Sequence, residues 1–275
     1  STVTTPDYYF SHHEPFLTRP EQYADQSEVT IQAEPGLPEP SRKERTRVLH
    51  EWMEFLSHPT PIRRLSLYCE VKDELLATLV NQPQLEGLEV HGTKFTNFEV
   101  LHSLTNLRIL HLGHASAVTS LDGLVGLPLE VLDLENTWKI TDYSRLGDLT
   151  GLVDLRVGPG PGGNRYDSES IGFLDSLFRL DTLYWDPRVR SLDFTPILRL
   201  TQASMIGIRK TKGMNPSYTN LEWCVPGVRA YEERNGRKVI PVFVDGERRG
   251  TIEQDITGRT VINSVKPQDS SAADT

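Results

Sequence analysis

Carboxylate and imidazole side chains recur between leucines in the middle of the chain, and together they could support three kinds of chemistry. Glu89 and His91 stand two residues apart, as do Asp133 and Glu135, and His111 lies between these two pairs in the sequence. Imidazole nitrogens and carboxylate oxygens are ligands of divalent metals. An imidazole beside a carboxylate can also act as a general acid or base. On an exposed surface, the same groups would attract a basic partner.

A short apolar pattern surrounds these residues and must position them. L-x-x-L-x-L occurs six times, with 23, 22, 22, 23 and 28 residues between successive first positions. Periods of about 20 to 29 residues with this spacing are typical of leucine-rich repeats, which stack into solenoids. The first positions of the six copies and of a degenerate seventh are Ile62, Leu85, Leu107, Leu129, Leu152, Leu180 and Ala203.

Alternation within the pattern predicts a β-strand in each repeat. Leu110 and Leu112 lie on one face of the strand, so His111 between them must point to the other. The second half of each repeat carries apolar residues of its own, such as Ile140 and Leu146. One repeat cannot bury both halves alone. We therefore expect the repeats to stack, with their strands forming a parallel sheet on the concave side of an arc.

The same alternation predicts which side chains share the concave surface. Neighbouring strands lie about 4.8 Å apart, so the imidazoles and carboxylates of the middle repeats should be neighbours. One predicted row contains Ser66, Glu89, His111, Asp133, Arg156 and Tyr184. The next contains Tyr68, His91, Gly113, Glu135, Gly158 and Asp186. A third, on the other side, contains Arg64, Gly87, Ile109, Val131, Asp154 and Thr182.

The second halves of the repeats resemble those of a known family. Ile140-Thr141-Asp142 is followed by Leu146 and Leu149, and residues 118–122 begin a similar apolar series. These segments are similar to the short repeats of bacterial internalin-like proteins. The resemblance covers roughly residues 60 to 208 and implies a curved solenoid. Thr93, Ala115 and Thr137 stand where that family usually carries a ladder of buried asparagines.

The fifth repeat is longer than the others, and the excess falls in residues 158–167. This segment contains a formal G-x-G-x-x-G pattern before a predicted helix over residues 168–180. Two prolines within it remove backbone amides that a phosphate cradle would need, so we reject a dinucleotide site. Insertions in repeat arrays form protruding loops. Arg165 and Tyr166 are therefore predicted at the tip of the loop as partner contacts, with a plain flexible linker as the alternative.

The N-terminal part of the chain is expected to cap the solenoid. Residues 1–40 are rich in proline and polar residues, so we predict a mostly irregular segment in which residues 29–31 alternate as a short strand would. Ser41 and Glu44 then form the capping-box pattern of a helix start. Apolar residues follow at helical spacing. We predict a capping helix over residues 41–59, because terminal repeats expose apolar edges.

The pattern changes again after the predicted solenoid of residues 60–227. Residues 239–244, an Asp245-Gly246 turn signal and later β-prone pieces predict a small β-rich cap over residues 228–264. Because Pro241 gives no ladder hydrogen bond, we expect its strand at an edge. The polar residues 265–275 predict a disordered tail.

Charge and composition narrow the kinds of partner. A formal net charge of -9 argues against a nucleic-acid backbone or an anionic membrane, because both favour basic surfaces. No stretch approaches the roughly 18 apolar residues of a spanning helix, and residues 1–16 do not resemble a signal peptide. We expect a cytoplasmic protein, or an extracellular one after removal of a signal peptide. Cys69 and Cys224 are far apart in a repeat array, so no disulfide is expected.

These observations predict an α/β leucine-rich repeat solenoid with a helical N-terminal cap and a small β-rich C-terminal cap. Our hypothesis is a non-enzymatic module without metal or cofactor, which recognises and neutralises a basic protein through its concave face and fifth-repeat loop. The alternatives are a metal-dependent or hydrolytic enzyme centred on His91, His111 and Asp133, and a structural assembly protein. The predicted partner contacts are Tyr68, Glu89, His91, His111, Asp133, Glu135, Arg156, Arg165, Tyr166, Tyr184 and Asp186.

Overall fold

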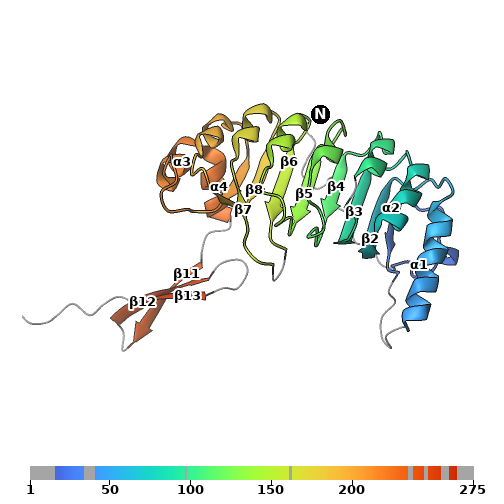
Figure 1. The fold of residues 1–275 in the computed structure, drawn as a ribbon. Coiled ribbons are helices and arrows are strands. Elements are labelled where there is room, and N and C mark those ends of the chain that lie inside the picture. Colours follow the sequence, from blue (N-terminus) through green and yellow to red (C-terminus); the bar gives the residue numbers. More distant parts are fainter. Residues whose placement is uncertain are drawn as a thin grey trace, which may run out of the picture.

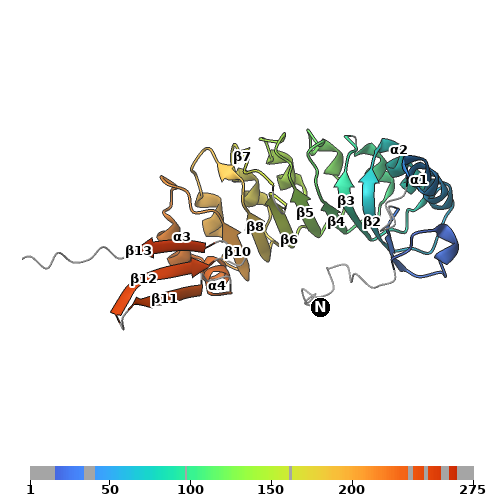
Figure 2. The same cartoon turned by 90° about the horizontal axis from the view of Figure 1, so that it is seen from below.

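The protein folds as a curved stack of repeats. The computed structural model describes residues 16–33, 41–96, 98–160, 163–234, 238–244, 247–254 and 260–264. Eight strands form one sheet in which every neighbouring pair is parallel. The strands follow the inner side of an arc, with helices and 3₁₀ turns along the outer side (Figure 1), and they lie side by side when seen from below (Figure 2). In order across the sheet they are β1 (Glu28–Ile31), β2 (Arg64–Val71), β3 (Gly87–Thr93), β4 (Ile109–Leu112), β5 (Val131–Glu135), β6 (Asp154–Gly158), β8 (Thr182–Trp185) and β10 (Met205–Ile208).

A ladder of leucines through the middle of the strands holds the repeats together. Leu110 on β4 is in register with Leu88 on β3 and with Leu132 on β5, and the alignment continues across the sheet. These three side chains are fully buried, so each contributes about 1.5–3 kcal/mol relative to an exposed position. One apolar core extends from Leu17 to Val228. The continuous core predicted from stacking is therefore confirmed.

Short 3₁₀ turns form most of the outer side, because the apolar residues there recur every third position. In the fifth repeat, the Leu174 N–H donates to the Ile171 carbonyl and the Leu177 N–H to the Leu174 carbonyl, both at 3.1 Å. A 3₁₀ helix has about three residues per turn, so all three side chains face the core. The predicted helix over residues 168–180 is therefore wrong, since this segment contains only β7, which pairs with β9, and η7. Between β2 and β10, the elements outside the main sheet are α2 (Asp73–Thr78), η3 (Leu79–Asn81), η4 (Glu99–Ser103), η5 (Asp122–Leu124), η6 (Ser144–Asp148), β7 (Asp167–Ser168), η7 (Gly172–Ser176), β9 (Arg188–Val189) and η8 (Thr195–Arg199).

The first repeat is covered by the predicted capping helix. α1 (Arg42–Leu56) begins where the Ser41 hydroxyl accepts a hydrogen bond from the Glu44 N–H at 3.2 Å. An N-cap of this kind stabilises a helix by about 1 kcal/mol. Trp52 and Leu56 on its inner face are buried against the repeats. The start of the helix and its apolar face agree with the sequence pattern.

The N-terminal segment adds a strand at one edge of the sheet. η2 (Pro20–Gln22) precedes β1, which contains the short strand predicted at residues 29–31 within a mostly irregular segment. β1 lies parallel to β2. Its outer edge is also occupied: the Leu17 N–H donates to the Thr30 carbonyl, and the Gln32 N–H donates to the Leu17 carbonyl, both at 2.9 Å. The sheet thus extends one strand beyond the first repeat.

Two helices close the other end of the array, where the sequence predicts a β-rich cap from residue 228. α3 (Tyr218–Cys224) and α4 (Pro226–Arg234) follow β10, and α4 packs against it. This close approach requires Gly227, where a Cβ would lie 2.6 Å from the Ala203 carbonyl oxygen. The predicted cap is therefore wrong at its start, because helices cover β10.

Three antiparallel strands follow α4 in the order β11 (Lys238–Val244), β12 (Glu247–Gln254) and β13 (Thr260–Ser264). Pro241 pairs with Thr251 on β12, and its strand β11 is at an edge, as predicted. The predicted Asp245-Gly246 turn and the tail of residues 265–275 lie outside the described residues. In the described parts of the chain, no helix has the length and apolar character needed to cross a membrane.

Candidate functional site

The strand register brings the predicted concave side chains into one row. Glu89 on β3 is opposite His111 on β4, and His111 is opposite Asp133 on β5. Asp133 is in turn opposite Arg156 on β6, which is opposite Tyr184 on β8. Each step crosses one strand spacing of about 4.8 Å. Ser66 on β2 is likewise opposite Glu89, so the predicted row is present across six strands.

Glu89 lies at the centre of a buried polar cluster, with only 6% of its side chain exposed. The Ser66 hydroxyl donates to Glu89 Oε2 at 2.6 Å. Glu89 Oε1 lies 3.2 Å from His91 Nε2 and 3.9 Å from His111 Nδ1. Burial alone would raise the pKa of Glu89, but the contacts from His91 and Ser66 outweigh it and hold the pKa below its ordinary value. Glu89 is therefore a carboxylate that its neighbours keep ionised.

Aromatic rings continue this cluster towards the first repeat. The Tyr68 and His91 rings stack with centroids 3.5 Å apart and planes at 29°. The His91 and His111 centroids are 6.1 Å apart, at 22°, and Phe16 packs on the Tyr68 side with centroids at 5.5 Å. Stacked rings of this kind form flat surfaces with a large contact area. Tyr68 is therefore half-buried between the Phe16 and His91 rings at the first-repeat end of the cluster.

Asp133 and Glu135 supply negative charge without an arginine or lysine partner. His111 Nδ1 is 3.7 Å from Asp133 Oδ2, and no Lys or Arg within the described residues is ion-paired with either carboxylate. Burial, reinforced by the charges of Glu135 and Glu89, raises the pKa of Asp133 to about 7. Burial also lowers the pKa of His111, against the attraction of Glu89 and Glu135. A cationic group brought to Asp133 would relieve this repulsion.

Two other carboxylates of the face already have arginine partners. Asp186 accepts hydrogen bonds on both oxygens from Arg209 Nη2, each at 2.7 Å. Asp154 accepts from Arg156 Nε at 3.1 Å and from Arg156 Nη2 at 3.3 Å. The pair with Arg209 offsets the charge of Asp186, whereas burial, reinforced by the charge of Asp133, raises the pKa of Asp154 to about 7 despite its contact with Arg156. The electrostatic roles predicted for Asp186 and Arg156 are therefore weaker than their residue types indicate.

Tyr184 is the exposed aromatic residue at the other end of the row. It is 37% exposed, and Gly207 on β10 is directly opposite it. A Cβ at Gly158 on β6 would lie 3.1 Å from Tyr184 Cε1. Gly158 therefore leaves room for the phenol ring of Tyr184, and Gly207 leaves room for the ring of Tyr231 on α4, since a Cβ at Gly207 would lie 2.6 Å from Tyr231 Cζ. The centroids of the two tyrosine rings are 6.4 Å apart.

The fifth-repeat loop places its two predicted contact residues in different environments. Arg165 is exposed, but Tyr166 is only 8% exposed. Its hydroxyl is 3.4 Å from Thr137 Oγ1, which is 2.8 Å from the Tyr143 hydroxyl. The prediction of Tyr166 at the loop tip is therefore wrong, because its ring gains more from burial, where the hydroxyl still finds a partner. Residues 161–162 of the loop lie outside the described residues.

A cavity of about 620 Å³ lies beside this loop, and the sequence did not predict it. Residues that follow β3, β4 and β5 form one wall, and the loop forms the other. Trp138, which is 52% exposed, belongs to the first wall. His114 and Asn136 have positive φ angles of 49° and 60°, which turn the chain sharply after each strand. The lining residues are Lys94, His114, Ser116, Asn136, Trp138, Gly163, Asn164, Arg165 and Tyr166.

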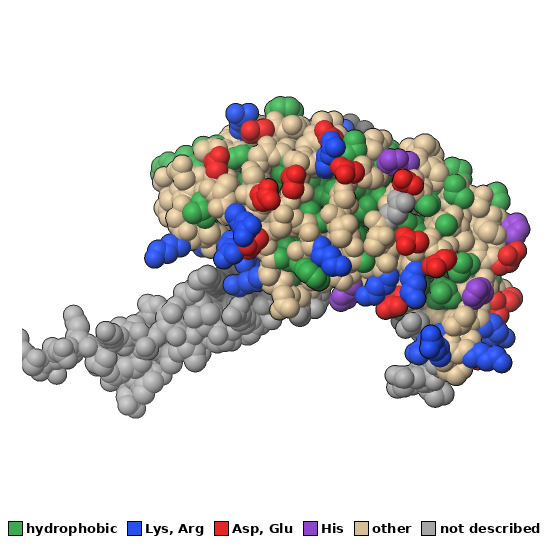
Figure 3. Space-filling model, viewed as in Figure 1, with side chains coloured by type: hydrophobic (Ala, Val, Ile, Leu, Met, Phe, Trp, Pro, Cys, Tyr) green, Lys and Arg blue, Asp and Glu red, His purple; other side chains and the backbone are tan. Residues whose placement is uncertain are grey.

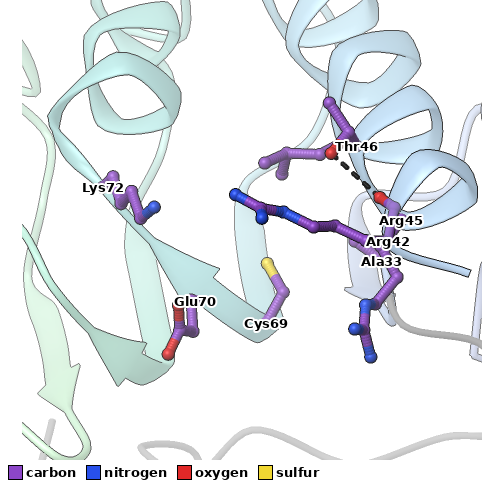
Figure 4. Close-up of a pocket in the computed structure, with 8 residues that line it drawn as sticks. Ala33, Arg42, Arg45, Thr46, Cys69, Glu70 and Lys72 are labelled. Carbon is purple, nitrogen blue, oxygen red and sulfur yellow. Dashed lines mark hydrogen bonds between the residues drawn. The ribbon is translucent and has the colours of Figure 1, made fainter.

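A smaller cavity, of about 150 Å³, lies between α1 and β2 (Figure 4). Arg42 and Arg45 on the helix and Lys72 after the strand line it, together with Cys69 and Glu70. None of the predicted partner contacts lines this cavity. It is therefore separate from the concave row.

The metal and hydrolytic alternatives depend on how the imidazoles and carboxylates of the row are placed. Among the described residues, no group of three or more His, Cys, Asp or Glu side chains is placed to hold a metal ion. His111 and Asp133, the pair considered for hydrolysis, are 3.7 Å apart, which is longer than a hydrogen bond. The closest imidazole–carboxylate contact of the row is instead the one between His91 Nε2 and Glu89 Oε1, at 3.2 Å.

No protein-family model matches the chain, and no curated protein matches it. Among solved structures, it is similar to an internalin C2 of Listeria monocytogenes, with 19% sequence identity and a TM-score of 0.43, over 58% of this chain and 75% of that chain. It is also similar to the internalin inlF of the same bacterium, with 21% identity and a TM-score of 0.41, over 54% of this chain and 48% of that chain. Both are internalins, the type of protein that the sequence resembles. By its repeat period, its parallel sheet and its continuous core, the chain is a leucine-rich repeat solenoid.

Proposed function

We propose that the protein is a binding module that takes a basic protein surface onto its concave face. The observation that carries this proposal is the environment of Asp133. Burial and the charges of Glu135 and Glu89 raise its pKa to about 7. A lysine or arginine of a partner would remove that repulsion, so binding and ionisation of Asp133 would favour each other.

The shape of the face supports a partner of protein size. Eight strands about 4.8 Å apart give a sheet roughly 34 Å wide, which is enough for a standard interface of about 800 Å² per partner. Tyr68 and Tyr184 lie at opposite ends of the acidic residues, and aromatic side chains are common anchors in such interfaces. A basic toxin or enzyme held there would have its own charged surface covered. We infer that the module would neutralise a partner of this kind.

The test is affinity capture from the native cell lysate with three forms of the protein. These are the wild type, Asp133→Lys/Glu135→Lys, and a charge-matched control, Glu54→Lys/Glu74→Lys. Glu54 and Glu74 are exposed carboxylates on α1 and α2. Captured proteins are identified by mass spectrometry, and the affinity of each is then measured by calorimetry with purified components.

The control separates an effect of the face from an effect of net charge. The proposal expects one stoichiometric protein with a basic surface, retained by the wild type and the control and weakened at least about tenfold by Asp133→Lys/Glu135→Lys. Equal capture by all three forms would overturn the concave face as the binding site. Equal loss in both variants would show attraction to net charge alone, which also contradicts the proposal.

A further inference from the structure

The described residues that line the cavity beside the fifth-repeat loop are cationic or neutral, although the chain as a whole is acidic. Lys94, Arg165 and His114 line it, and none of its nine lining residues carries a carboxylate. The chain as a whole has a formal net charge of -9. Figure 3 shows Lys, Arg and His side chains along the lower rim of the solenoid, with Asp and Glu side chains among them. A cationic cavity on an acidic protein selects for an anionic group.

Neither Lys94 nor Arg165 is ion-paired within the described residues, although other arginines of the solenoid are paired with Asp or Glu. Both side chains are exposed. An anion that reached the cavity would therefore find two cations that need not break an internal pair. Charge-assisted hydrogen bonds of this type are about twice as strong as neutral ones.

The cavity also offers an aromatic surface and amide groups. Trp138 is 52% exposed, and Lys139 Nζ lies 5.4 Å from its ring centroid. Exposed tryptophans are among the commonest energetic anchors of protein interfaces. The amides of Asn136 and Asn164 and the Ser116 hydroxyl line the same space. Amide groups can pair with the backbone of an extended peptide as well as with its side chains.

The wall of the cavity that the fifth-repeat loop forms is held by hydrogen bonds at its base. The Tyr166 carbonyl accepts a hydrogen bond from the Arg188 N–H at 2.9 Å, and its hydroxyl is 3.4 Å from Thr137 Oγ1. Asp167 accepts from the Arg188 guanidinium at 2.9 and 2.7 Å. A wall held on both sides in this way reduces the entropy lost when a ligand binds. The volume, about 620 Å³, is within the usual range of roughly 300 to 1,000 Å³ for ligand sites.

We propose that this cavity binds an acidic peptide segment of a protein partner, with a carboxylate on Lys94 and Arg165 and an apolar or aromatic side chain on Trp138. An acidic peptide is favoured because its carboxylates, its apolar side chains and its backbone could contact the cations, the indole and the amides of the cavity at the same time. The cavity adjoins the concave face, since Asn136 directly follows Glu135. The proposal does not depend on the concave face, because it concerns a separate site with the opposite charge preference.

The test follows the indole signal of Trp138 by NMR in protein labelled with ¹⁵N at tryptophan. The chain has four tryptophans, and Trp138→Phe identifies the signal of interest. The probe is a synthetic peptide, acetyl-Gly-Glu-Tyr-Glu-Glu-Gly-amide, titrated into the millimolar range. Its matched control replaces every Glu with Gln. The proposal expects a saturable shift of the Trp138 signal with the Glu peptide, and binding at least about tenfold weaker with the Gln peptide.

Variants of the two cations test the assigned contacts. Lys94→Gln/Arg165→Gln is expected to weaken binding at least about tenfold, while Lys212→Gln/Arg179→Gln removes the same charge from exposed positions outside the cavity. Arg165→Glu should bind the corresponding Lys peptide more tightly than the wild type does. No saturable shift, equal binding of the Glu and Gln peptides, or equal weakening by both double variants would each overturn the proposal. Asp133→Lys/Glu135→Lys should retain peptide binding, which separates this site from the concave face.

Discussion

The Tyr166 hydroxyl lies 3.4 Å from Thr137 Oγ1, and this contact joins the base of the fifth-repeat loop to the core. Thr137 is fully buried and also lies 2.8 Å from the Tyr143 hydroxyl. The hydroxyls of Thr137, Tyr143 and Tyr166 therefore form hydrogen bonds with one another. Internalin-like proteins, which the sequence resembles, usually carry a buried asparagine amide at the position of Thr137. Loop and repeat share this small polar cluster, so the position of the loop depends on it.

Removing one hydroxyl should weaken that connection measurably. We expect Tyr166→Phe to lower the free energy of unfolding by about 0.5–1.5 kcal/mol, because a buried hydrogen bond is lost while the ring still packs. Urea unfolding followed by circular dichroism measures the change. Tyr231→Phe serves as a control at a tyrosine outside this hydroxyl cluster. An unchanged stability for Tyr166→Phe would show that the Thr137 contact contributes nothing.

Asp133 should make stability depend on pH. Its pKa is about 7 in the folded protein and about 3.9 in an unfolded chain. At pH values between these two pKa values, Asp133 keeps its proton in the folded state but has released it in the unfolded state. The free energy of unfolding should therefore fall as pH rises, by up to about 1.4 kcal/mol per pH unit.

The variant Asp133→Asn removes this contribution, and with it the charge that, after burial, helps to raise the pKa of Asp154. Urea unfolding at about pH 5, 6, 7 and 8 should show the variant gaining stability relative to the wild type as pH rises. Glu89 has the opposite effect, because its pKa is lowered, but it acts below its ordinary value of 4.5. Parallel curves for the two proteins across this range would contradict a raised pKa at Asp133.

Binding of a basic partner should show the reverse dependence. A cation stabilises ionised Asp133, so affinity should increase as pH rises through about 7. In Asp133→Asn the increase should be smaller, since no proton is released there. Calorimetry in two buffers of different ionisation enthalpy measures the protons released on binding. No proton release from the wild type would count against Asp133 as a contact.

Tyr184 should contribute to affinity more than to stability. It is 37% exposed and has glycines beside it on both neighbouring strands. We expect Tyr184→Ala to weaken partner binding by about thirtyfold, in the range of an interface hot spot. The free energy of unfolding should change by less than about 1 kcal/mol. Trp223→Ala, at an exposed aromatic residue of α3, is the matched control, and equal effects of the two changes would argue against Tyr184 as an anchor.

Gly227 should resist a substitution that helix propensity favours. In an open helix, Gly→Ala stabilises by about 1 kcal/mol. Here a Cβ would lie 2.6 Å from the Ala203 carbonyl oxygen and 3.2 Å from Ile206 Cγ1. We therefore expect Gly227→Ala to destabilise the protein by about 1–3 kcal/mol, because α4 must move away from the last repeat. A rise in the thermal midpoint would show that α4 is not held closely against β10.

The repeat period was sufficient to predict the sheet and the neighbours within it. Because side chains alternate along a strand, the position of each leucine also determines that His111 lies between Glu89 and Asp133. The pair between Asp186 and Arg209 was missed, although these residues are 23 positions apart, one full repeat. The predicted row that ends at Asp186 stops at the sixth copy of the pattern. Had it been continued into the degenerate seventh copy, Arg209 would have been predicted beside Asp186.

Features that depend on contacts between distant segments could not be read from the pattern. The three-residue spacing of Ile171 and Leu174 fits a 3₁₀ turn as well as a helix, and packing against the neighbouring turn decides between them. Tyr166 has no apolar periodicity of its own, and its burial depends on Thr137, 29 residues away. The cavity is lined by His114 and Asn136, whose φ angles are positive. Both residue types are enriched at positive φ, but most Asn and His residues have negative φ, so residue type alone does not predict these turns.

Both ends of the main sheet are occupied, by Leu17 beside β1 and by α4 against β10. A further repeat has no open edge on which to dock at either end. In evolution, or in a design that lengthens the protein, growth would therefore have to proceed by internal duplication. A repeat inserted between β4 and β5 would meet the same leucine ladder on both sides, but it would also separate His111 from Asp133. Lengthening the array at that point would therefore divide the acidic row that we propose as the binding face.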